Sequence, residues 1–315
     1  VKQLIGSYSD IHNGRVFSFA NFAEEKEIDD IYTLSATVTD KAGRSTTKSI
    51  SFSVNRFGST YSIDKDIADL NNSYVKEAKD VVVTEINANE LSNIKITLFK
   101  NNETIVLKNG TDYKIDVTGG NGQWYKYVYT IFAKNFAEDG VYRLSIHSED
   151  AAGNVAENTL DTKDMEINFG VDSTLPTINI NNLESGATYA LDNMTVQMSI
   201  NDNLNLTKVT VFLDGKEYQV WSDEDIKAII NEGGVFTFDI SGDSTEAHTL
   251  SVVAVDAAGN EITEEVKDFY VTTNLWVRYY NNKGAFYGSI GGVVAAAGLG
   301  VFLVVWKRRK DEKKA

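Results

Sequence analysis

The stretch "LSVVAVDAAGN" at residues 250–260 decides the fold, because two close variants of it stand earlier in the chain. They are "LSIHSEDAAGN" at residues 144–154 and "LSATVTDKAGR" at residues 34–44. The glycine near the end of each copy stands at positions 43, 153 and 259, so the copies are 110 and 106 residues apart. That spacing is the length of one small domain. The repeated unit is therefore a domain.

Each copy predicts a strand that is followed by a tight turn. Apolar residues alternate with other residues, as at Leu250, Val252 and Ala254, which is the period of a half-buried strand. The aspartate after the strand can bond the backbone two residues on, and the glycine supplies a positive φ at low cost. A second strand follows each turn, so each copy is a hairpin. We assign this structural role to Asp40, Gly43, Asp150, Gly153, Asn154, Asp256, Gly259 and Asn260.

The composition favours packed β-domains. The chain has 315 residues, of which 42% are hydrophobic, and this is enough for two or three cores. Around each hairpin, short alternating runs are separated by turn signals, and about seven strands in about 100 residues is the pattern of a β-sandwich. One short helix is expected from Ser222 to Gly233, because acidic residues fill its first turn and isoleucines follow at helical spacing.

A different pattern marks the C-terminal end. Residues 284–306 carry no charge, and this length of helix spans roughly 34 Å, enough to cross a bilayer. The basic tail at 307–315 marks the cytoplasmic side, so we expect a single transmembrane helix with the domains outside the cell. Small residues recur at every fourth position and permit close helix pairing, although glycine-rich anchors also occur without a partner. These residues are Gly288, Gly292, Ala296 and Gly300.

Charge and cysteine content exclude several functions. The net charge of −15 would repel a nucleic acid backbone, so no nucleic acid partner is expected. Without cysteine there is no disulfide and no thiolate metal site. Carboxylates at 24–25, 29–30 and 223–225 could hold Ca²⁺ between domains, but none has the spacing of a calcium loop. Solvation, or the helix N-terminus for the third cluster, explains them, so we expect no cofactor and leave structural Ca²⁺ open.

One aromatic strand offers a candidate ligand strip. In "TGGNGQWYKYVYTIF" at residues 118–132, strand alternation places Tyr125, Tyr127 and Tyr129 on one face. If that face points outward, it is a flat strip suited to sugars or to a protein partner. If it points inward, the tyrosines belong to the core. The core interpretation is favoured, and the ligand strip is kept as the alternative.

The phrases "YRLSIHSEDAAGN" and "HTLSVVAVDAAGN", with "VDSTLP" between the domains, resemble bacterial Ig-like repeats of Gram-positive surface proteins. They are also similar, more loosely, to fibronectin type III domains. The resemblance implies a wall-spanning stalk or an adhesin module. It also places Tyr32 and Tyr142 where such sandwiches have a corner tyrosine, whereas His248 stands there in the third copy. No Leu-Pro-x-Thr-Gly motif precedes the apolar stretch, so covalent attachment to a cell wall is not expected.

These observations predict an all-β protein of tandem Ig-like, fibronectin-III-like β-sandwiches followed by one C-terminal transmembrane helix. The sequence has no His-Glu-x-x-His, Gly-x-Ser-x-Gly or phosphate-loop motif, so the fragment is not expected to be an enzyme. We interpret it as a single-pass surface protein of the cell membrane, a stalk or adhesin that displays an upstream region and contacts a host or polysaccharide ligand. The alternatives are the anchor and spacer of a surface enzyme, either a glycan hydrolase or a protease, and a carbohydrate-binding module.

The predicted boundaries follow from the repeat spacing and the apolar stretch. They are a partial or atypical Ig-like domain at 1–60, sandwiches at 61–172 and 173–272, a juxtamembrane linker at 273–283, the transmembrane helix at 284–306 and the basic tail at 307–315.

Overall fold

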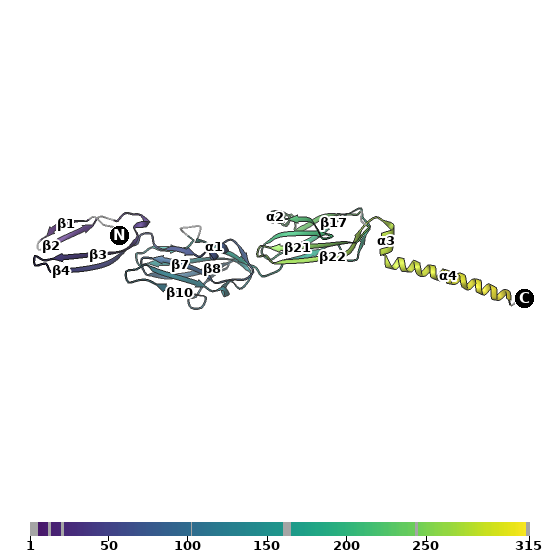
Figure 1. Ribbon diagram of the computed structural model, residues 1–315, viewed down its shortest axis with the longest axis horizontal. Coiled ribbons are helices and arrows are strands. Elements are labelled where there is room, and N and C mark those ends of the chain that lie inside the picture. Colours follow the sequence, from purple (N-terminus) through teal and green to yellow (C-terminus); the bar gives the residue numbers. More distant parts are fainter. Residues whose placement is uncertain are drawn as a thin grey trace. The chain divides into compact units, whose positions relative to one another are not determined.

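A computed structural model describes residues 6–11, 14–19, 22–101, 103–159, 165–242 and 245–312 (Figure 1). The end of the predicted tail at 313–315 and the start of the predicted first domain at 1–5 lie outside the described residues. The chain divides into two compact units, Val1–Ser173 and Thr174–Ala315.

The first unit begins with two antiparallel hairpins. One joins β1 to β2 and the other joins β3 to β4, with the single 3-10 turn η1 between them. Their bounds are β1 Gly6–Ile11, β2 Gly14–Phe19, η1 Lys26–Ile28, β3 Asp30–Thr39 and β4 Ser45–Val54.

A complete β-sandwich follows in the same unit, and we call it the second sandwich because it carries the second copy of the repeat. One sheet has the strand order β10-β11-β7-β5, and the other has the order β6-β14-β12-β8-β9, with β13 also paired to β12. The strands are β5 Thr60–Ile63, β6 Tyr74–Val75, β7 Val81–Asn87, β8 Leu91–Lys100, β9 Glu103–Val106, β10 Tyr113–Thr118, β11 Tyr125–Ile131, β12 Gly140–Asp150, β13 Val155–Glu157 and β14 Ile167–Val171. The helical turns are α1 Lys65–Leu70 and η2 Ala133–Phe136.

The second unit holds the other sandwich, which we call the third sandwich because it carries the third copy of the repeat, and then two helices. Its sheets have the orders β15-β17-β20 and β16-β22-β21-β18-β19. The strands are β15 Thr177–Ile180, β16 Thr188–Tyr189, β17 Asn193–Asn201, β18 Leu206–Leu213, β19 Lys216–Trp221, β20 Val235–Ser241, β21 His248–Asp256 and β22 Glu261–Val271. The helices are α2 Asp223–Asn231, α3 Leu275–Asn281 and α4 Lys283–Glu312.

The predicted short helix is confirmed as α2. Ser222 and Asp225 form a reciprocal capping box, in which the Ser222 backbone N–H donates to Asp225 Oδ2 at 2.9 Å. Lys227 Nζ lies 2.6 Å from Asp223 Oδ2. The acidic cluster at 223–225 therefore serves the helix N-terminus.

In both sandwiches the repeated sequence forms the central strand of the larger sheet. β12 lies between β14 and β8, and β21 lies between β22 and β18. Leu144 and Ile146 are fully buried, as are Leu250 and Val252, and each pair belongs to its own hydrophobic core. The repeat is thus the strand on which each core is assembled.

The first copy has the same hairpin but a different environment. Among the residues that the structure describes, β3 pairs with β4 alone, so the two strands form a ribbon, Asp30–Thr39 with Ser45–Val54. One face of this ribbon carries hydroxyls that bond in cross-strand pairs, such as Thr37 with Thr47 at 2.8 Å. The other face is mostly apolar, and it leaves Leu34 37% and Val38 72% exposed.

Helix α4 extends the predicted membrane span at both ends. Among the described residues it is the one helix that is long and apolar enough to cross a membrane, over Lys283–Arg309, and the mean hydropathy of its most apolar window is 2.1. None of its most apolar window is buried. The predicted linker at 273–283 is not irregular throughout, because it contains helix α3.

The unequal burial of one repeated position allows a matched test. Leu250→Ala should lower the free energy of unfolding of the third sandwich by about 2–5 kcal/mol, because it leaves a cavity in the core. Leu34→Ala, at the same place in the exposed ribbon, should cost about 0.5 kcal/mol or less. Urea denaturation of the full chain in detergent, followed by amide hydrogen exchange in β21 and β3, measures both. Equal costs would show that the assigned burial of β21 is wrong.

Candidate functional site

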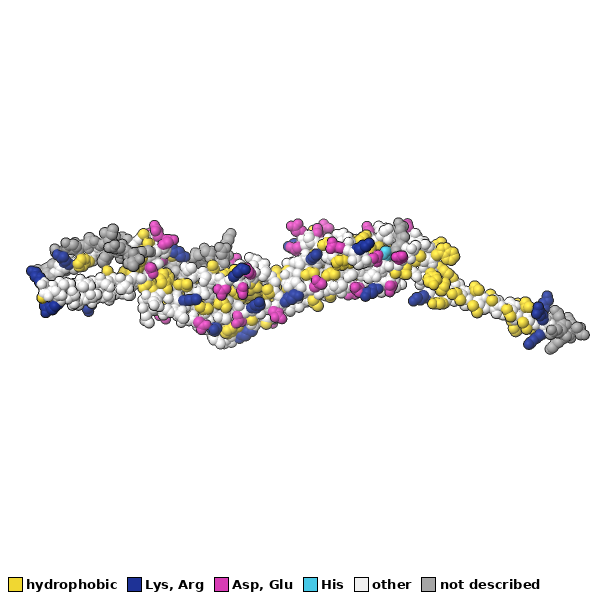
Figure 2. Space-filling model, in the orientation of Figure 1, with side chains coloured by type: hydrophobic (Ala, Val, Ile, Leu, Met, Phe, Trp, Pro, Cys, Tyr) yellow, Lys and Arg dark blue, Asp and Glu magenta, His cyan; other side chains and the backbone are white. Residues whose placement is uncertain are grey.

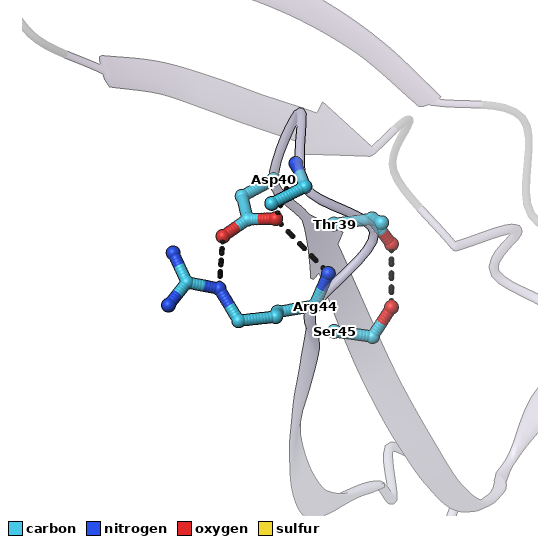
Figure 3. A network of polar contacts seen from close by, with 5 residues as sticks. Thr39, Asp40, Arg44 and Ser45 are labelled. Carbon is cyan, nitrogen blue, oxygen red and sulfur yellow. Dashed lines mark hydrogen bonds and ion pairs between the residues drawn. The ribbon is translucent and has the colours of Figure 1, made fainter.

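The turn after each repeated strand is closed by its aspartate. In the first copy, Asp40 Oδ1 accepts from the backbone N–H of Ala42 at 2.8 Å and of Arg44 at 2.9 Å. Asp40 Oδ2 accepts from Arg44 Nε, and the pair Thr39 and Ser45 closes the hairpin behind it (Figure 3). Gly43 has a φ of +81°, a conformation that a side chain would strain.

The other two copies repeat this geometry. Asp150 Oδ1 accepts from the backbone N–H of Ala152 and of Asn154, each at 2.9 Å. Asp256 Oδ1 accepts from the backbone N–H of Asn260 at 2.8 Å. Gly153 and Gly259 have φ angles of +88° and +83°. These residues therefore hold the turn, and nothing in their geometry points to catalysis.

Tyrosine corners close the start of the same strands. The Tyr32 hydroxyl donates to the Ile28 carbonyl at 2.6 Å, and the Tyr142 hydroxyl donates to the Glu138 carbonyl at 2.5 Å. The predicted corner role of both tyrosines is confirmed. His248 makes a different contact in the third copy, because its Nδ1 lies 2.8 Å from Asp214 Oδ2 in the β18–β19 turn.

The favoured core interpretation of the β11 tyrosines is confirmed for Tyr127 and Tyr129, and the alternative of a ligand strip is wrong. Tyr127 is 3% exposed and Tyr129 is fully buried, and both belong to the core of the second sandwich. The Tyr127 hydroxyl accepts from the Leu91 backbone N–H at 2.8 Å. Only Tyr125, which is half-buried, borders the surface. Strand alternation placed the three rings on one face, but the opposing sheet makes that face the inner one.

A buried carboxylate lies beside Tyr129, and sequence analysis missed it. Glu85 is fully buried on β7; its Oε2 accepts from the Tyr129 hydroxyl at 2.6 Å and its Oε1 from Ser148 Oγ at 2.5 Å. Burial and the nearby Glu85 charge raise the pKa of Tyr129 and of Tyr61 far above the ordinary tyrosine value. Both therefore remain protonated. The sequence "VVVTEIN" at residues 81–87 contained a sign of this carboxylate, because Glu85 alternates in step with Val81 and Val83 and therefore faces inward.

A second polar network lies where the chain enters the second sandwich. Asn55 Nδ2 lies 2.8 Å from side-chain oxygens of Asn87, Asn89 and Asp150. Asn154 Nδ2 donates to Asp150 Oδ2 at 2.9 Å and lies 3.1 Å from the Asn55 carbonyl. Asn55, Asn87 and Asp150 are all buried. We call Asn55, Asn87, Asn89, Asp150 and Asn154 the entry network. It links Asn55 to Asp150 of the repeated turn, which lies 95 positions later in the chain.

The entry network continues into a contact between the ribbon and the second sandwich. Asp29 Oδ2 accepts from the backbone N–H groups of Arg56 at 2.8 Å and of Phe57 at 2.9 Å. Asp30 Oδ1 accepts from Trp124 Nε1 at 3.0 Å. The prediction that solvation explains the acidic pair at 29–30 is therefore wrong, because both carboxylates tie the ribbon to the sandwich.

An open cleft of about 260 Å³ lies beside this contact. Two aromatic rings, three side-chain amides and one carboxylate line it. They include Phe52, Asn89, Glu90, Asn121, Gln123 and Tyr125.

The remaining predicted sites are placed as follows. Gly288, Gly292, Ala296 and Gly300 are exposed on α4, and helix pairing through them stays a prediction.

In the second unit, carboxylate oxygens of Asp202 and Asp256 lie within 4.8 Å of one another. Two such groups are a small part of the six to eight oxygens that Ca²⁺ takes, so structural Ca²⁺ stays a proposal.

Asp150 gives the entry network a pH dependence. Burial opposes its ionisation, but hydrogen bonds from Asn154, Asn87 and Ala152 outweigh burial and hold the pKa of Asp150 below its usual value. A carboxylate with a lowered folded pKa stabilises the fold above its unfolded pKa of about 3.9, and this stabilisation is lost as pH falls through the folded pKa.

Asp150→Asn should therefore destabilise the second sandwich near neutral pH, by about 1–3 kcal/mol for buried donors that lose a charged acceptor. It should also flatten the loss of stability below about pH 4. Urea denaturation across a pH series measures both effects. Asp116→Asn, at an exposed position on β10, is the control and should keep the wild-type slope. An unchanged slope in Asp150→Asn would remove this carboxylate from the network.

Comparisons with known proteins assign no family to the chain. No family model and no curated protein matches it. It is similar to fibronectin(III)-like modules of CbhA from Clostridium thermocellum, with 15% identity and a TM-score of 0.31 over 69% of this chain and 96% of that one. A tetra-tandem repeat from the extending region of a large adhesion protein has 15% identity and a TM-score of 0.34. That match covers 84% of this chain but 65% of the other, so the chain spans less than two thirds of it.

A structure of a 1.5-MDa bacterial ice-binding adhesin has 18% identity and a TM-score of 0.28, over 82% of this chain and 80% of that chain. The strand orders described above show the fold class directly. The chain is an all-β protein of tandem Ig-like, fibronectin-III-like sandwiches, followed by one C-terminal apolar helix.

Proposed function

We propose that this chain is a membrane-anchored, non-enzymatic bacterial surface protein, a stalk of sandwiches that displays an upstream region outside the cell. The observation that carries the proposal is the exposed surface of α4. The helix starts directly after α3 and presents apolar side chains all around, with none of its most apolar window covered by protein. A bilayer is the solvent for which such a surface is suited.

The orientation rests on the residues that flank the helix. Lys307, Arg308 and Arg309 follow the apolar stretch at its C-terminal end, and basic residues are retained on the cytoplasmic side. The sandwiches precede the helix, so they lie on the outer side.

The stalk role rests on how the domains are stabilised. The chain has no cysteine, so burial and hydrogen bonding alone hold each sandwich. The entry network and the Asp29 and Asp30 contacts tie the ribbon to the second sandwich through side chains rather than through a bare linker. Ordered junctions of this kind suit a protein that must hold something at a distance.

The ribbon supports display of an upstream region. In the two complete sandwiches the strand that matches β3 has a neighbour on both edges and a sheet packed over its apolar face. In the ribbon, Val38 and Ile50 are exposed at that face. We infer that strands of the displayed region complete this layer, because an apolar face of a sheet is stable in water only when it is covered.

The absence of cysteine makes the topology directly testable. Lys216→Cys places a thiol at an exposed position of strand β19. In intact cells that express the full chain, this thiol should react with a membrane-impermeant maleimide. Ala315→Cys should react only after lysis, because it lies beyond the basic flank. The wild-type chain is the blank. Reversed labelling would overturn the orientation, and recovery of the chain in the soluble fraction would overturn the anchor.

A second candidate function is adhesion through the cleft beside the ribbon. The rings of Phe52 and Tyr125 border it together with Asn89, Asn121 and Gln123. Aromatic faces with convergent amides are the chemistry that binds the apolar and hydroxyl surfaces of a sugar. This hypothesis retains one tyrosine of the predicted strip and moves the site to the junction.

The cleft hypothesis predicts that the full chain in detergent binds a member of a polysaccharide panel saturably. Tyr125→Ser should weaken that binding, because it removes the ring from the cleft wall. Tyr218→Ser, at an exposed position in the other unit, is the matched control and should bind as the wild type does. Glycan arrays followed by calorimetry measure both variants. Absence of saturable binding by folded protein would leave the chain as a spacer.

A further inference from the structure

The short helix α3, Leu275–Asn281, carries an exposed aromatic surface just before the candidate membrane span. Trp276 is 80%, Leu275 73% and Tyr280 67% exposed. Figure 2 shows hydrophobic side chains gathered where α3 meets α4. Large apolar side chains that are grouped in this way mark a surface that contacts something other than water.

Local hydrogen bonds fix where α3 begins. The side chain of Asn274 caps the helix, because its Oδ1 accepts from the backbone N–H of Trp276 at 2.9 Å and of Val277 at 3.4 Å. The Asn274 N–H in turn donates to Thr272 Oγ1 at 3.1 Å, and Thr272 is buried in the sandwich. Only Thr273 separates that buried residue from the cap, so α3 follows the last strand without a loose linker.

A second asparagine separates α3 from α4. The Asn282 N–H donates to the Arg278 carbonyl at 3.1 Å, which ends α3. The Asn282 side chain accepts from the Ala285 N–H at 3.1 Å, which caps the start of α4. The two helices therefore differ in direction, as Figure 1 shows, and the bend between them is made by hydrogen-bonded residues.

Aromatic contacts hold α3 against the first turns of α4. The rings of Tyr279 and Phe286 lie 5.9 Å apart, and those of Tyr280 and Phe286 lie 4.6 Å apart. The Tyr279 hydroxyl also bonds Ser289 on α4. The depth of α3 is thereby set by the depth of α4, because the two helices share these contacts.

We propose that α3 is a second membrane contact, a helix that lies in the headgroup region with Leu275, Trp276 and Tyr280 against the acyl boundary. The occupant of this surface is lipid, because the surface is continuous with that of the candidate span. Tryptophan and tyrosine suit that depth, since each has an apolar ring with a polar tip. Arg278 and Lys283 supply cations for lipid phosphates at the same level.

This inference rests on the proposed membrane anchor and extends it. If α3 lies about 5–10 Å into the interface, the third sandwich is seated on the membrane rather than tethered above it. The short capped connection from Thr272 to α3 then limits how far the sandwich can tilt.

Depth-resolved quenching of Trp276 tests the proposal. The probe is the full chain with Trp306→Phe, placed in phosphatidylcholine and phosphatidylglycerol vesicles whose acyl chains are brominated either near the headgroup or near the terminal methyl. The Trp276 emission, obtained as the difference from the same chain with Trp276→Phe, should be lost mainly to the shallow bromines. Emission from Trp124 and Trp221, which the Trp276→Phe chain retains, is the internal control and should be unaffected.

The outcomes separate this inference from the anchor. A chain that floats with the vesicles but keeps its Trp276 emission overturns the inference and leaves the anchor standing. A chain that does not float overturns both. If bromine does not quench Trp276 and cross-linking gives a dimer, a second copy of the chain, rather than lipid, covers the α3 surface. The variant Leu275→Ser with Trp276→Ser should still float, and faster hydrogen exchange in α3 is the expected result.

Discussion

Both sandwiches depend on the hydrogen bonds that one aspartate makes to the turn after the central strand. Asp150 and Asp256 each accept from backbone N–H groups of that turn, and a glycine with positive φ completes it. The turn sets the register of the strand that follows. A slip of one residue would move every buried side chain of the hairpin to the solvent face, so the core depends on this small polar contact.

The aspartate of the second sandwich has a further role that its counterpart in the ribbon lacks. Asp40 Oδ2 bonds Arg44 at the surface, whereas Asp150 Oδ2 lies in the buried entry network with Asn55 and Asn87. The same turn therefore serves as a structural cap in one place and as part of a domain junction in another. Burial makes the difference, because a polar group removed from water must find partners in the protein.

The two ends of the described chain share a physical feature, which is apolar surface that the described residues do not cover. The ribbon exposes Val38 and Ile50, and α3 with α4 exposes Trp276 and a long apolar helix. The partners that we propose for these two surfaces are further strands at one end and lipid at the other.

The sequence alone determined the three hairpins, the capped helix α2 and the apolar span, because each depends on local spacing and local turn chemistry. It also located the corner tyrosines Tyr32 and Tyr142. It did not determine which face of β11 is inside, because alternation is symmetric until a second sheet packs on one side. The entry network was also decided by tertiary structure, because Asn55 and Asp150 are distant in the chain and meet only when the sandwich closes. Glu85 lies between these cases, since its inward position was readable but its partners, Tyr129 and Ser148, come from two different sheets.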